Sequence, residues 1–160
     1  MDIFAHFLWT FALFFKRKDR WLAGLFGILP DVASFGPHFI LSFVAGTTIF
    51  GRPELSTIPG SVFILYNLTH SLVVFALAVL IIYFITKKIY WFITGWGLHV
   101  LIDIPTHTKD FFPTPFLYPF PQPFINGIRW SDSTFMKINY GLLVIVYGIL
   151  IYWVLKNEKK

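Results

Sequence analysis

Four polar side chains interrupt the otherwise apolar, helix-length stretch at residues 95–107: His99, Asp103, Thr106 and His107. His99 and Asp103 are four residues apart, so on a helix they lie on one face, one turn apart. A carboxylate and an imidazole are costly inside an apolar membrane segment, and ionisable residues there mark functional sites by default. The pair therefore predicts a functional site on this segment.

Three other apolar segments each carry one similar group, and together with the first pair they form the predicted site: His6, Asp31, His70, His99 and Asp103. Imidazole and carboxylate are the ligands that zinc and manganese take where no cysteine is available, and the chain has none. We therefore predict that all five bind a divalent metal, with zinc as the expected ion. They suffice for one metal with a spare group, or for two metals that share a carboxylate. The spare group, for which we favour Asp31 in a catalytic role, would orient a ligand or act as a general base.

Each of these residues also has a purely structural interpretation. His99 and Asp103 can form a buried hydrogen-bonded pair, as in many membrane helix bundles. Asp31 follows a proline and can end a helix or lie in a turn. His70 can bond to a neighbouring carbonyl, and His6 lies near a segment end, where water is available.

The composition indicates a membrane protein. Of the 160 residues, 56% are hydrophobic and 13% are charged, and the mean hydropathy is +0.68. These values exclude an ordinary soluble domain, in which about 25% of residues are charged. We predict an all-α, polytopic integral-membrane helical bundle of about four to six helices, formed as a single domain by residues 1–160. The chain begins without a basic region or a small-residue cleavage site, so we expect no removable signal peptide.

Apolar runs predict the transmembrane segments at residues 3–15, 21–29, 61–86, 89–107 and 136–155. A further run at residues 37–50 is either a re-entrant or interfacial helix, or the continuation of the preceding span after a break. Residues 108–133 are rich in proline and aromatic residues, so they cannot form one continuous helix. We expect this loop to lie in the membrane interface or to fold over the bundle as a lid.

The basic residues predict an orientation, and the net charge of +5 is not taken as a sign of nucleic-acid binding. Clusters at residues 16–20, 87–88 and 156–160 alternate along the chain so that all three fall on one side, which the positive-inside rule makes cytoplasmic. The N-terminus would then lie outside and the C-terminus inside. His99 lies ~16 Å from Lys88 along a helix, and Asp31 lies ~16 Å from Arg20, at ~1.5 Å per residue. All five predicted ligands fall between the middle of the membrane and its outer half.

Four short motifs carry a resemblance over about residues 5–120. They are ILPD at residues 28–31 with His6 upstream, THS at 69–71, GWGLHVLID at 95–103 and LYPF at 117–120. In this order they resemble the family of small inner-membrane metal-dependent hydrolases, which is grouped distantly with zinc-dependent phospholipase C. The resemblance implies that His6, Asp31, His70, His99 and Asp103 are metal ligands. It also implies a prokaryotic inner (plasma) membrane, membrane lipids as partners, and a lipid-like phosphoester or ester as substrate.

The chain departs from the family pattern at two positions. Ala33 stands where the pattern has a second aspartate, and Leu65 stands where it has the first histidine of the central motif. The chain therefore keeps about as many ligands as one metal ion requires. That leaves three interpretations: a mononuclear enzyme, a divergent subfamily that uses His107, or a non-catalytic relative.

Three functions are compatible with the sequence. The first is a membrane-embedded metal-dependent hydrolase, in which a metal-activated water attacks a lipid-like substrate. The second is a non-enzymatic protein that transports ions, protons or metal, but the stretches leading toward the basic clusters, residues 73–85 and 142–155, are almost entirely apolar. The third is a structural or partner-binding membrane protein whose polar groups hold helices together. The sequence leaves the oligomeric state open.

Overall fold

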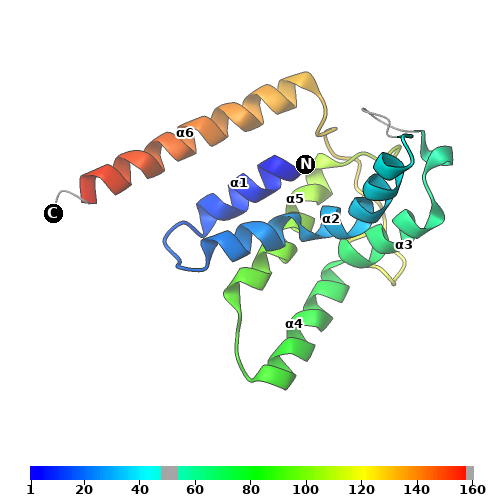
Figure 1. Ribbon diagram of the computed structural model, residues 1–160, viewed down its shortest axis with the longest axis horizontal. Helices are drawn as coiled ribbons and strands as arrows, with labels where there is room; N and C mark the ends of the chain where they lie inside the picture. Colours follow the sequence, from blue (N-terminus) through cyan, green and yellow to red (C-terminus); the bar gives the residue numbers. More distant parts are fainter. Residues whose placement is uncertain (48–53, 158–160) are drawn as a thin grey trace.

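The computed structural model describes residues 1–47 and 54–157, and within these ranges all regular secondary structure is helical (Figure 1). The helices are α1 (Ile3–Leu13), α2 (Arg20–Val44), α3 (Gly60–Thr69), α4 (Leu72–Thr86), α5 (Thr94–Thr106) and α6 (Ser133–Asn157), with short 3₁₀ helices η1 (Leu55–Thr57) and η2 (Trp91–Ile93). The prediction of an all-α chain is confirmed for this part of the chain.

Two of these helices, α2 and α6, are long and apolar enough to cross a membrane. Each has 25 residues, which corresponds to ~37 Å at ~1.5 Å per residue and exceeds a hydrocarbon core of ~30 Å. A third crossing is formed if α3 and α4, which meet at an angle of 63°, count as one broken span. The structure is thus consistent with insertion into a membrane.

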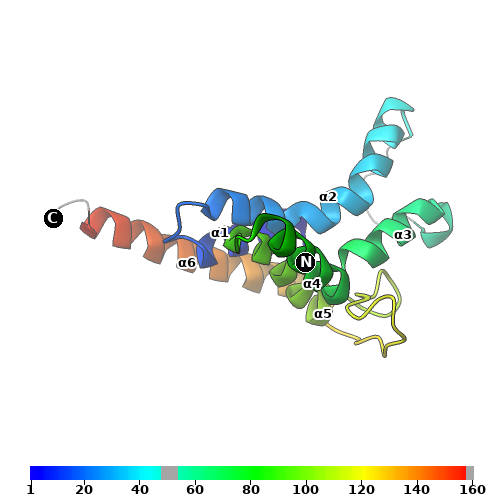
Figure 2. The ribbon, with the colours of Figure 1, turned by 90° about the horizontal axis from the view of Figure 1, so that it is seen from below.

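Helix α2 covers two of the predicted apolar runs without interruption. It runs through Pro30 and Pro37, so the second run is a continuation of the first; residues 48–50 of that run lie outside the described residues. A proline lacks the N–H that a helix interior uses and crowds the preceding turn. Ser34 Oγ donates to the carbonyl of Pro30 at 2.8 Å, and Figure 2 shows α2 changing direction along its length.

The predicted span at residues 61–86 is not one straight helix, which corrects the sequence interpretation. The break falls at His70 and Ser71, where the Ser71 side chain accepts from the amides of Val73 and Val74 and so begins α4. The segment that follows α5, at residues 108–132, also stabilises the break through backbone carbonyls. Its carbonyls at Phe116 and Tyr118 accept from Leu72 N at 2.9 Å and from Ser71 Oγ at 2.6 Å.

Helices α1, α2 and α5 approach one another through glycines. A Cβ atom added to Gly95 would lie 2.3 Å from the carbonyl oxygen of Ala23, and one added to Gly27 would lie 2.5 Å from Thr10 Oγ1. Only glycine permits such backbone contact. Membrane helices pack in this way because lipid removes the hydrophobic drive for their association.

The segment after α5, residues 108–132, folds back onto the end of that helix. The amides of Gly127, Ile128 and Trp130 donate to the carbonyls of His107, Pro105 and Thr106 at 2.8, 2.9 and 3.0 Å. These bonds satisfy carbonyls that a helix C-terminus leaves without partners. The same segment buries Phe112 and Thr114 and exposes Phe120 and Ile128, while its role as a lid stays a prediction.

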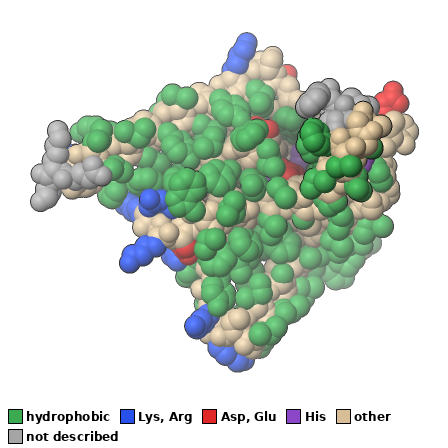
Figure 3. Space-filling view, in the orientation of Figure 1, with side chains coloured by type: hydrophobic (Ala, Val, Ile, Leu, Met, Phe, Trp, Pro, Cys, Tyr) green, Lys and Arg blue, Asp and Glu red, His purple; other side chains and the backbone are tan. Residues whose placement is uncertain are grey.

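The basic turns lie away from the N-terminus, which Figure 1 shows near the middle of the molecule beside α5. Figure 3 shows Lys and Arg side chains gathered over the α1–α2 turn and over the turn that follows α4. In the first turn Arg17 Nε donates to Asp19 Oδ1 at 2.8 Å. This bond lowers the pKa of the Asp19 carboxyl below its ordinary value.

Candidate metal centre

Four ligand atoms converge at the point where α2, the α3–α4 break and α5 meet. They belong to Asp31, His70, His99 and Asp103, and all four lie within 4.8 Å of one another. His70, His99 and Asp103 are completely buried, whereas the side chain of Asp31 remains 19% exposed. The structure thus brings together four of the five predicted ligands in a group that can hold a metal ion.

The distances within this group match a single tetrahedral ion. His99 Nε2 lies 3.1 Å from both His70 Nε2 and Asp103 Oδ2, and His70 Nε2 lies 3.6 Å from Asp103 Oδ2. Asp31 Oδ1 lies 3.4 Å from His70 Nε2 and 3.8 Å from His99 Nε2. A tetrahedron with metal–ligand bonds of ~2.0–2.1 Å has edges of ~3.3–3.4 Å. Five of the six separations are distributed around that value, and the sixth, between the carboxylate oxygens of Asp31 and Asp103, is within 4.8 Å, so the ligands have to draw closer to hold an ion.

The tautomers of the two histidines support the same conclusion. His99 Nδ1 lies 2.7 Å from the carbonyl oxygen of Gly27, and His70 Nδ1 lies 3.2 Å from that of Tyr66. A carbonyl only accepts, so each Nδ1 carries the proton and, in the neutral ring, each Nε2 presents a lone pair to the centre. Metal-binding histidines are oriented in this way.

The centre also lacks a hydrogen-bond donor. The two Nε2 atoms face two carboxylate oxygens, and Asp103 Oδ2 has no hydrogen-bond partner among the described residues. A buried carboxylate oxygen without a partner is strongly unfavourable. A cation bound between the four atoms removes this cost.

The fifth predicted ligand, His6, lies beside the group and not within it. Its Nε2 is 2.9 Å from Asp103 Oδ1, the carboxylate oxygen that faces away from the other ligands. Its ring stacks on that of His99 with a centroid separation of 3.7 Å. Asp103 Oδ1 also contacts the Met1 amine and lies 3.4 Å from Thr106 Oγ1. In this position His6 fixes the orientation of two ligands.

His107 occupies a similar outer position on the opposite side. Its Nδ1 lies 3.7 Å from Asp103 Oδ2 and 3.2 Å from both the Tyr66 hydroxyl and Thr114 Oγ1. The Tyr66 hydroxyl donates to the carbonyl of Phe112 at 2.8 Å. The segment that follows α5 is therefore connected to the centre through side-chain hydrogen bonds.

The sequence analysis did not find Tyr66, Thr114 or the carbonyl of Gly27. A signal for Tyr66 was present, because it precedes His70 by four residues and so shares its helix face. The Tyr66 and His70 rings stack at 3.8 Å. No local pattern points to Thr114 or to a backbone carbonyl, which reach the site only through the tertiary fold.

Access to the centre is asymmetric, because Asp31 is the only one of the four ligands with an exposed side chain. A molecule from outside therefore meets Asp31 first. Leu29 and Val32 on the same helix are 38% and 45% exposed.

Comparison with known proteins finds no matching protein-family model, no matching characterised protein and no matching solved structure.

Proposed function

We propose that the protein is a polytopic integral-membrane, metal-dependent hydrolase that acts on a lipid-like phosphoester or ester. The observation that carries the proposal is the buried convergence of two Nε2 atoms and two carboxylate oxygens without a donor between them. The motif resemblance at residues 28–31, 69–71 and 95–103 supports the same class. It also supports a prokaryotic inner membrane, with the basic turns in the cytoplasm and the N-terminus outside.

Zinc is the ion that we propose, held by His70, His99 and Asp103, with Asp31 as a fourth ligand that a water molecule displaces when the site is active. The preference rests on the N₂O₂ donor set, the tetrahedral distances and the absence of cysteine. Zinc at such a site lowers the pKa of a bound water to ~7 and so supplies hydroxide at neutral pH.

The residues around the zinc site have different proposed roles. His70, His99 and Asp103 are buried and held by the backbone or by His6, so they are the fixed ligands. Asp31 is partly exposed and is the carboxylate that can accept a proton from the attacking water. His6 holds Asp103 in its ligating orientation.

The substrate class follows from the surroundings of Asp31. The exposed side chains near it on α2 are apolar, and the segment at residues 108–132 exposes Phe120 and Ile128, 62% and 63% accessible. Such a surface suits a substrate that remains partly in the membrane. Phosphodiesters and phosphomonoesters are the first choice, by the motif resemblance.

The first part of the proposal, that the protein binds zinc, is tested by measuring its metal content. The protein purified in detergent is expected to contain about one equivalent of zinc per chain. His99→Ala should leave less than about a tenth of an equivalent, because it removes one of four ligands. His38→Ala is the matched control, since His38 lies on α2 outside the group, and it should retain the wild-type content. Equal metal content in wild type and His99→Ala would show that no specific centre exists.

The second part of the proposal, that the protein is a hydrolase, is tested by measuring its activity. Fluorogenic phosphodiester, phosphomonoester and carboxylic ester probes in mixed micelles should reveal hydrolysis that a chelator abolishes and zinc restores. Asp31→Asn should lower kcat by roughly 10²–10⁴-fold, as expected for loss of a general base. Bound metal without hydrolysis, combined with metal or proton flux into liposomes that Asp103→Asn abolishes, would establish transport instead. Cells that remain fully functional with His70→Ala and His99→Ala together would favour a structural role.

A further inference from the structure

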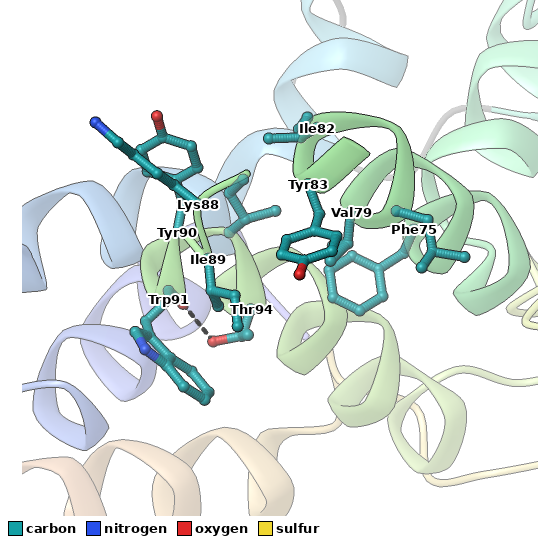
Figure 4. A pocket seen from close by; sticks show the side chains of 11 residues that line it. Phe75, Val79, Ile82, Tyr83, Lys88, Ile89, Tyr90, Trp91 and Thr94 are labelled. Carbon is teal, nitrogen blue, oxygen red and sulfur yellow. Dashed lines mark hydrogen bonds between the residues drawn. The ribbon is translucent and has the colours of Figure 1, made fainter. Parts of the chain in front are cut away.

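A second concave site lies between α4 and the start of α5, on the far side of the Phe75–Trp96 contact from the metal centre. It is a groove of about 400 Å³ between α4 and the segment 88–94 that precedes and begins α5. Phe75, Val79 and Tyr83 of α4 line one side, and Ile89 and Thr94 line the other (Figure 4). The volume is within the range of sites that take small ligands, and the lining is almost entirely apolar.

The groove exists because α4 diverges from the rest of the helices after the break at His70. Figure 1 shows α4 leaving the neighbourhood of α5 and turning back only at its far end. No residue of α4 is buried. Beyond its first turn, where Phe75 packs against Trp96, the described residues leave the groove-facing side of this apolar helix largely uncovered, so another molecule can cover it.

The end of the groove nearest the metal centre is closed. The ring of Phe75 packs edge-on against Trp96 with a centroid separation of 5.7 Å. A Cβ atom on Gly97 would lie 2.7 Å from the Phe75 ring, which shows how tightly this contact is packed. A molecule in the groove therefore enters from the far end and does not reach Asp31 or the histidines.

The open end is basic. Lys88 lines it, Lys87 is adjacent in the left-handed turn that ends α4, and the guanidinium of Arg17 lies 5.9 Å from the ring of Trp91. Arg17 is also paired with Asp19. None of the described residues that line the groove is acidic. Tyr90 and Trp91 stand beside the lysines, as aromatic side chains do at the level of lipid headgroups.

We propose that this groove binds one anionic phospholipid, with an acyl chain between α4 and residues 88–94 and its phosphate at Lys87 and Lys88. Basic pockets between membrane helices on the positively charged side bind anionic headgroups, and the charge of the rim selects them over zwitterionic lipids. The lipid is a structural ligand and not a substrate, because Phe75 and Trp96 separate it from the metal centre. The inference rests on membrane insertion and is independent of the hydrolytic function.

Native mass spectrometry of the detergent-solubilised full chain tests this proposal, with phosphatidylglycerol and phosphatidylcholine as the added probes. Wild type should retain one phosphatidylglycerol in preference to phosphatidylcholine. Neutralising both lysines, in Lys87→Gln/Lys88→Gln, should weaken retention of phosphatidylglycerol roughly 25-fold, at roughly fivefold for each charge. Lys156→Gln on α6 is the matched control and should bind like wild type. Val79→Trp, which fills the groove, should abolish retention of the lipid.

Zinc content of each variant shows whether it is folded, since none of the substituted residues contacts a ligand of the metal centre. Lipid loss in variants with wild-type zinc content supports the proposal. Equal retention of the two lipids by wild type, or undiminished retention by Val79→Trp, overturns it. A dimer that dissociates in Val79→Trp would show that a second copy of the chain occupies the groove, which also overturns it. If wild type itself lacks zinc, a cooperative thermal transition replaces the zinc readout, so failure of the metal proposal leaves this test intact.

Discussion

The two ends of the molecule are built in different ways. Around the metal centre the side chains of His6, Thr10, His70, His99 and Asp103 are completely inaccessible. Away from the centre, on opposite sides of the molecule (Figure 1), α4 buries no residue and α6 buries only Asn139 and Leu143. Both ends are made of apolar helices, so hydrophobicity does not explain the difference.

The difference shows which forces organise helices in lipid. Apolar side chains gain little by leaving one hydrocarbon environment for another, whereas backbone contacts and hydrogen bonds between helices do stabilise. The compact end has both, in the close approach at Gly27 and Gly95 and in the polar network around Asp103. The open end has fewer of both: α6 is held to α1 by the hydrogen bonds of Trp9 to Asn139 and of Tyr147 to the Leu8 carbonyl, and α4 buries no residue. The following substitutions test this contrast, from the largest expected effect to the smallest.

Asp103→Ala should have the largest effect. It leaves His6 and the Met1 amine buried without their partner and removes a ligand. Loss of one member of a buried charge pair costs about 3–5 kcal/mol. We expect the thermal unfolding transition in detergent to fall well below that of wild type, with zinc lost. Asp19→Ala, in the exposed α1–α2 turn, is the control; an equal effect of the two variants would contradict the contrast.

Gly95→Ala should destabilise the compact end without touching a ligand atom. The added methyl group would collide with the Ala23 carbonyl, and overpacking of this kind costs about 1–3 kcal/mol. Zinc affinity should fall as α5 moves away from α2. Gly148→Ala on α6 provides the comparison at the open end, because a Cβ there meets nothing within 4 Å. Thermal unfolding and zinc titration of the two variants should differ clearly, and similar results would show that the glycine contact is unimportant.

His6→Ala should weaken the centre while leaving all four converging atoms in place. Removing a group that orients a metal ligand lowers metal affinity by roughly 10–100-fold. Competition with a zinc chelator of known affinity measures this change. A loss as complete as that of His99→Ala would mean that His6 is itself a ligand, as the sequence analysis predicted.

Ile81→Ala should have the smallest effect. Its side chain is 57% exposed on α4, and exposed substitutions usually change stability by less than about 0.5 kcal/mol. Thermal unfolding in detergent should be close to that of wild type. A shift as large as that of Gly95→Ala would show that α4 is buried against a partner in solution.

Parts of this architecture were predictable from the sequence for physical reasons. Spacing within one helix is fixed by geometry, so the pairing of His99 with Asp103 followed from their separation. Conversely, the break at His70 depends on carbonyls of Phe116 and Tyr118, more than forty residues away, and no local rule contains that information. The continuity of α2 through two prolines was also hidden, because proline normally favours an interruption.

The sequence also predicted that His6 binds the metal in the same way as the other four residues. Here too, the information that separates His6 from them lies in the tertiary fold. Counting residues along the helices predicted that His6 lies near the other four residues, as it does, but it could not determine which oxygen of Asp103 His6 meets. That distinction depends on the rotation of α1 about its axis, which the contact between Thr10 and Gly27 helps to set. An amphipathic pattern would have revealed this rotation, but in lipid such patterns are weak.

The backbone contact at Gly95 has a consequence for the choice of ion. Asp31 comes from α2, while His99 and Asp103 come from α5, so the spacing of these two helices determines the bite of the ligand set. With the helices touching at Ala23 and Gly95, the bite corresponds to an ion of small radius with bonds of ~2.0–2.1 Å. Calcium, which needs ~2.3–2.6 Å and six to eight oxygens, would have to force the helices apart. For the proposed zinc site we therefore expect selectivity against large cations to depend on Gly95, a residue outside the ligand set.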